Sequence, residues 1–131
     1  MATVDFTDIA YDELRIVARA VTKQTTGTLN LRVSVNNGSS FKTASGEYVA
    51  IDALGIETPL TGIPLHDTNA TAARSGSIIL SGLRSSQKKF ARAENRGIAT
   101  TVETTSIVNS VRVYPSGGGN NTGGTITVYG R

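Results

Sequence analysis

The closing stretch of the chain, SIVNSVRVYPSGGGNNTGGTITVYGR (residues 106–131), alternates β-branched and polar residues on both sides of a glycine-rich segment. This period of two predicts a strand on each side. Pro115 and the glycines that follow it resist continuing either strand, so we predict a long glycine loop at the tip of a hairpin. We expect the last strand to close a sheet against strands from earlier in the chain, which favours a β-sandwich.

The clearest strand upstream is 28–36, where Leu29, Leu31 and Val33 face one way and polar residues the other. The preceding stretch, 13–22, fits both helical and strand spacing. We interpret it as a strand because 28–36 pairs readily with it. Asn37-Gly38 supplies two residues that tolerate positive φ, which predicts a hairpin turn after the strand.

Shorter patterns complete the predicted sheet. We expect strands at 47–51, 76–82 and 97–103 and a short one near Val4–Phe6, with the run at 76–82 either buried on both faces or in a sandwich core. The stretch 52–73 predicts a long excursion with a short helix near Asp52. About eight short strands separated by turns predict an all-β chain, a single antiparallel sandwich of jelly-roll type spanning residues 1–131. Residues 1–12 are expected to be a docking arm.

The composition excludes several classes of chemistry. There is no cysteine, so a disulfide framework, a thiol nucleophile and a cysteine metal site are impossible. No apolar run approaches the roughly 20 residues that span a bilayer, and the N-terminus lacks the pattern of a signal peptide, so we expect no membrane insertion. The net charge of +3 is too small to indicate nucleic acid.

Catalytic and cofactor motifs are also missing from the sequence. The single histidine, His66, has Asp67 beside it, but neighbours in sequence do not form a triad. The glycine segment carries no lysine and does not precede a helix, so it is not a phosphate-binding loop. A small glycan hydrolase would need paired carboxylates, and no spacing of Asp52, Glu57 and Asp67 indicates them. We therefore predict no enzyme, no cofactor and no metal site.

Charge is distributed unevenly along the chain, and this suggests partner contacts. The basic segment is best explained as a charged surface loop; the alternative is that it meets the acidic start between copies of a homo-oligomer. One aromatic, Phe90, is too few for a nucleic-acid stacking surface. An exposed loop tip is also suited to contacts. The candidate contact residues are Asp5, Asp8, Asp12, Arg84, Lys88, Lys89, Arg92, Arg96, Asn120 and Asn121.

Four segments share one resemblance: the closing pattern of strand, small polar loop and strand ending in Tyr-Gly, the stretches 14–20 and 33–41, and the pair Tyr48-Val49. Together they resemble tailed-bacteriophage virion proteins. The resemblance implies a jelly-roll sandwich without catalytic residues, often trimeric. We expect a virion protein assembled in the bacterial cytoplasm, a capsid decoration or head accessory protein that contacts capsid or tail proteins as a homotrimer. The alternative is a tail-fibre or tail-tip module that binds a host surface glycan.

Overall fold

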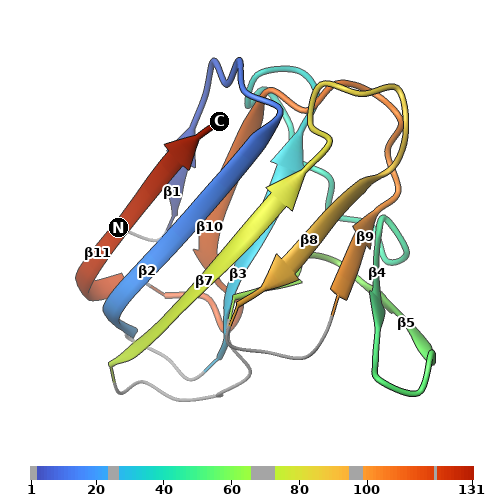
Figure 1. The fold of residues 1–131 in the computed structure, drawn as a ribbon. Helices are drawn as coiled ribbons and strands as arrows, with labels where there is room; N and C mark the ends of the chain where they lie inside the picture. Colours follow the sequence, from blue (N-terminus) through green and yellow to red (C-terminus); the bar gives the residue numbers. More distant parts are fainter. Residues whose placement is uncertain (1–2, 24–26, 66–72, 95–98, 120) are drawn as a thin grey trace.

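The computed structural model describes residues 3–23, 27–65, 73–94, 99–119 and 121–131, and these residues form strands and turns without a helix (Figure 1). The strands are β1 (Val4–Phe6), β2 (Glu13–Lys23), β3 (Leu29–Ser34), β4 (Tyr48–Ile51), β5 (Glu57–Leu60), β6 (Ile63–Pro64), β7 (Arg74–Ser81), β8 (Lys89–Ala93), β9 (Ala99–Val102), β10 (Ser110–Pro115) and β11 (Asn121–Gly130).

The strands form two antiparallel sheets. One has the order β1-β10-β3-β6 and the other the order β11-β2-β7-β8-β9-β4-β5. The prediction of an all-β chain is confirmed, but the number of strands among the described residues is eleven rather than eight. The three additional strands are short. β5 and β6 lie in the predicted excursion, where pairing with β4 and β3 organises segments that have no clear alternation of their own, and β8 lies in the basic segment.

A single aliphatic core lies between the two sheets. Alternate residues of β2 and β7 face alternate residues of β3 and β10, and all of them belong to one buried cluster. In β7, Ile78 and Leu80 are buried whereas Ile79 is only half-buried, so this strand buries one face. Tyr48 of β4 is fully buried, and its hydroxyl joins the sheets by accepting a hydrogen bond from the Val33 amide of β3 at 2.9 Å.

The predicted hairpin pairings are wrong. β10 and β11 belong to different sheets, so the segment between them crosses from one sheet to the other and is not a hairpin tip. Gly123 and Gly124 lie inside β11, where irregular register accommodates them. β2 and β3 are also in different sheets; each pairs with strands distant in the sequence. The sequence pattern identifies a strand's faces, but it does not identify the strand's neighbours.

Three local predictions, for the Asn37-Gly38 turn, the helix near Asp52 and the basic segment, also differ from the structure. Asn37 and Gly38 adopt positive φ angles of 56° and 86°, as predicted, but the chain leaves them for the other sheet rather than for a hairpin partner. The turn is held by Asp8, whose carboxylate accepts a hydrogen bond from the Asn37 side chain at 2.8 Å. The helix expected near Asp52 is a turn between β4 and β5. The basic segment contains strand β8, because Ala91 and Ala93 are buried on its inner face.

Candidate interaction surfaces

The acidic residues at the start of the chain make contacts within the molecule. Asp5 lies on β1 and forms a two-pronged ion pair with Arg112 of β10, with N–O distances of 2.7 and 2.8 Å. The hydrogen bonds from Arg112 lower the pKa of the Asp5 carboxyl, although partial burial opposes the shift. The predicted arm is therefore anchored as the edge strand of the smaller sheet, and Ile9 beyond it is buried in the core.

The acidic start and the segment at Arg84 also meet within one chain, through backbone amides rather than through an ion pair. The Asp12 carboxylate accepts a hydrogen bond from the Arg84 backbone amide at 3.0 Å, and the Asp12 carbonyl accepts one from the Leu83 amide at 2.9 Å. These bonds join the start of β2 to the turn after β7. Asp12 therefore positions that turn, and the Arg84 guanidinium lies at the exposed surface.

The residues of the basic segment differ in exposure. Lys88 is exposed and pairs with Glu103 at 2.7 Å, which raises the Lys88 pKa. Lys89 is fully buried, and its ammonium donates to the carbonyls of Ser85 and Gln87, so its prediction as a surface contact is wrong. Arg92 is exposed on β8. Arg96 lies outside the described residues, as do Asn120 and the pair His66 and Asp67.

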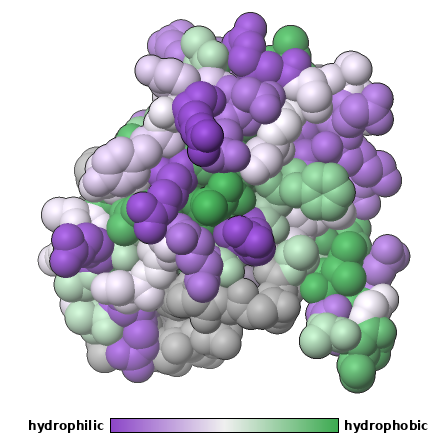
Figure 2. Space-filling model, in the orientation of Figure 1, coloured by the Kyte–Doolittle hydropathy of each residue, from purple (hydrophilic) through white to green (hydrophobic). Residues whose placement is uncertain are grey.

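The turn between β4 and β5 forms an apolar tip that sequence reasoning missed. Leu54 is 85% exposed and Ile56 is 56% exposed. The Asp52 carboxylate accepts hydrogen bonds from the amides of both residues, each at 2.9 Å, so the turn has a defined shape. This hairpin projects from the body of the molecule, with hydrophobic side chains gathered on it (Figures 1 and 2). The available signal was an Asp two residues before a Leu-Gly pair.

The two edge strands of the larger sheet differ in how well they are protected against pairing with a strand of another chain. β5 is one edge, and it carries Glu57 and Pro59, residue types that hinder pairing with another strand. β11 is the other edge; it is ten residues long and contains neither a charged residue nor a proline. No strand in the described part of the chain pairs with its outer side. Such an edge is suited to pairing with another chain.

A shallow groove of about 480 Å³ crosses the outer face of the larger sheet. Tyr129, which is 56% exposed, lies at one side of it. Glu94 lies in the groove and accepts hydrogen bonds from Arg15 and from Ser77, both at 2.8 Å. These two bonds hold the Glu94 pKa below its usual value. An aromatic ring beside fixed polar groups is an arrangement that can bind a polar, ring-shaped ligand.

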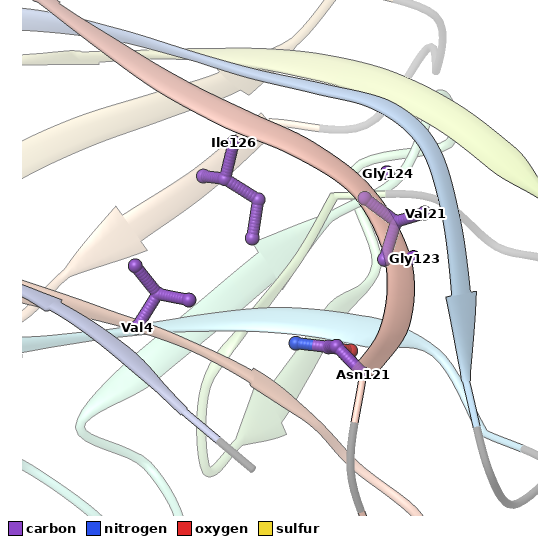
Figure 3. A pocket seen from close by; sticks show the side chains of 6 residues that line it. All are labelled: Val4, Val21, Asn121, Gly123, Gly124 and Ile126. Atoms are coloured by element: carbon purple, nitrogen blue, oxygen red, sulfur yellow. The ribbon is translucent and has the colours of Figure 1, made fainter. Parts of the chain in front are cut away.

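A fourth feature is a pocket of about 390 Å³ at the margin of the two sheets (Figure 3). Its walls come from β1, β2 and β11, and they include Val4, Val21 and Ile126. Asn121, predicted as a contact residue, lines this pocket. Its position at the first residue of β11 places it in the wall between the sheets rather than on an exposed loop.

Two kinds of feature are absent from the described residues. No three His, Cys, Asp or Glu side chains group there to hold a metal ion. Within the same ranges, no helix is long and apolar enough to cross a membrane. No family model and no curated protein matches this chain. The surfaces described above are therefore the basis for a functional proposal.

Proposed function

We propose that this protein is a non-enzymatic structural protein of a bacteriophage virion. It is a capsid decoration or head accessory protein of the jelly-roll sandwich type, and it assembles as a homotrimer on the particle. The observation that carries the proposal is the ordered apolar tip of the β4–β5 hairpin. Leu54 is almost fully exposed there, on a projection whose shape Asp52 maintains. Exposing such an apolar side chain to water costs free energy, and burial against a partner surface removes that cost.

The position of the tip favours a cyclic assembly. The tip lies at the β5 end of the larger sheet, and the unprotected β11 edge lies at the opposite end. A contact between these two features joins different surfaces of neighbouring copies. Contacts of this kind generate rings when the rotation closes, whereas a two-fold dimer uses the same surface twice. A trimeric ring is a closed assembly in which the tip of each copy contacts the β11 edge of the next. Particle proteins contact the remaining faces of the ring.

Sedimentation and particle binding test the proposal. In analytical ultracentrifugation, we expect the purified protein to sediment as a trimer. Incubated with phage capsids or tails, it should cosediment with the particles, and electron microscopy should show it at symmetric positions on their surface. A stable monomer that binds neither capsids nor tails contradicts the proposal.

The second candidate is a tail-tip module that binds a host surface glycan, and the Tyr129 groove favours it. Sugars stack on exposed aromatic rings and form hydrogen bonds with charged groups such as Glu94 and Arg15. In a glycan array, the wild-type protein should bind at least one bacterial surface glycan. Tyr129→Ala should lose that binding, whereas Tyr11→Ala, which removes another exposed tyrosine, should retain it. An array without hits contradicts this candidate.

A further inference from the structure

The pocket between the sheets contains polar groups without partners. Neither the side-chain oxygen nor the side-chain nitrogen of Asn121 is exposed to solvent, and neither has a hydrogen-bond partner among the described residues. The Asn121 side chain points from β11 toward the side of the pocket on which Val4 lies (Figure 3). Leaving a buried amide unpaired destabilises the fold, because each polar group has lost its hydrogen bonds to water without gaining new ones. A ligand that bonds to the amide would remove that cost.

Lys23 adds a buried positive charge beside this amide. It lies directly opposite Asn121 in the pairing of β2 with β11, so the two side chains project from the same face of the sheet. Lys23 is only 3% exposed, and its ammonium has no hydrogen-bond partner in the described part of the chain. Burial lowers its pKa, and the nearby charge of Arg74 lowers it further. Lys23 is not itself one of the lining residues, but its position opposite Asn121 puts a cation next to the polar end of the pocket, which favours an anion there.

The remaining walls determine the body of the ligand. Val4, Val21 and Ile126 provide an apolar lining, and the pocket volume of about 390 Å³ suits a small molecule. We propose that this pocket binds a small aliphatic carboxylate. The carboxylate accepts hydrogen bonds from the Lys23 ammonium and the Asn121 amide nitrogen, and the aliphatic chain lies between the two sheets. Such a group is found in a free short-chain acid or at the C-terminus of a peptide.

Calorimetry with matched probes tests the proposal. Hexanoate should bind the wild-type protein, and hexan-1-ol, which has the same chain without the charge, should bind at least tenfold more weakly. N-acetylleucine carries the carboxylate on a peptide unit, so its affinity relative to hexanoate distinguishes a peptide C-terminus from a free acid. If neither acid binds at millimolar concentration, or if the alcohol binds as well as hexanoate, the proposal is overturned.

Two variants separate binding from folding. Lys23→Met keeps the aliphatic stem without the charge; it should raise the melting temperature and weaken hexanoate binding at least tenfold. Asn121→Asp has the same shape but supplies an internal partner for Lys23, so it should also be more heat-stable and should repel hexanoate. Lys42→Met, outside the pocket, should bind as the wild type does. Undiminished hexanoate binding by Asn121→Asp or by folded Lys23→Met overturns the proposal.

Discussion

The ion pair between Asp5 and Arg112 attaches the first strand to the smaller sheet. β1 has only three residues, so its backbone bonds to β10 are few. The fork of Arg112 contacts both carboxylate oxygens of Asp5 and also stacks on the Phe41 ring at 4.2 Å. Geometry of this kind makes an ion pair stronger than the median surface pair. A single arginine thus connects β1, β10 and the segment after β3.

The Asp5 carboxylate should make stability depend on pH in the acidic range. Because its folded-state pKa is lowered, its contribution is fully present above the unfolded value of about 3.9 and is lost as the pH falls through the folded value. Asp5→Asn should cost about 1 kcal/mol at pH 6 and less at pH 3. Urea denaturation at both pH values measures the difference. In an Arg112→Met background the effect should disappear, and an equal cost at both pH values contradicts the prediction.

At the scale of elements, the pairing of β2 with β11 depends on a shared irregularity. Ala20 of β2 has a positive φ of 51°, and the register shifts on both sides of this strand near it. Opposite the bulge, Gly124 of β11 has a φ of +89°. A Cβ at Gly124 would lie 2.6 Å from the Ala20 carbonyl oxygen. The bulge redirects the end of β2, which places Val21 and Lys23 on the inner face.

Replacing Gly124 should therefore weaken this pair of strands. Gly124→Ala adds a strained φ and a backbone clash, with an expected cost of about 3 kcal/mol. Gly46 is a matched control, because its φ is also +89° but no atom lies within 4 Å of an added Cβ. Gly46→Ala should cost about 1–2 kcal/mol. Chemical denaturation measures the loss of unfolding free energy in both variants. Equal losses would show that the close approach of Gly124 to β2 adds nothing to the cost of the substitution.

At the scale of the whole molecule, the larger sheet has one protected and one unprotected end. Proline and charge protect β5, and the apolar tip projects beside it. The β11 edge has no such protection. In the head-to-tail ring that we propose, these two different ends are the contact surfaces of each copy. Leu54 makes no contribution to the core of its own chain, so packing within one copy does not explain why an apolar side chain lies in this exposed position.

The proposed trimer should be lost when the tip is made polar. We expect the double variant Leu54→Ser, Ile56→Ser to fold normally and to sediment as a monomer, because the removed side chains make no contribution to the core. Ile107→Ser, at a half-exposed apolar position elsewhere, should leave the trimer intact. The measurement is analytical ultracentrifugation of the three proteins. A trimer that survives the double substitution contradicts a role for the tip.

Some elements could be predicted from the sequence because their cause is local. In β3, the alternation of Leu29, Leu31 and Val33 identifies a strand and its buried face. The positive φ angles at Asn37 and Gly38 also follow from residue type. Strand β8 in the basic segment could not be predicted in this way, because its buried positions are occupied by alanines and by Lys89. The aliphatic stem of Lys89 is covered, while its ammonium donates hydrogen bonds to backbone carbonyls.

The sequence by itself determined that this chain is built from strands, which residues of β3 and β10 face inward, and that no cysteine chemistry occurs. Only the tertiary structure decided which strands pair, because an alternating pattern marks two faces but carries no information about the neighbour at each edge. For the same reason, the pocket at Asn121 could not be predicted, and the Asp52 pattern indicated a turn but not the exposure of Leu54. Each depends on segments distant in the sequence or on a side chain's exposure, and both are set by packing of the whole chain.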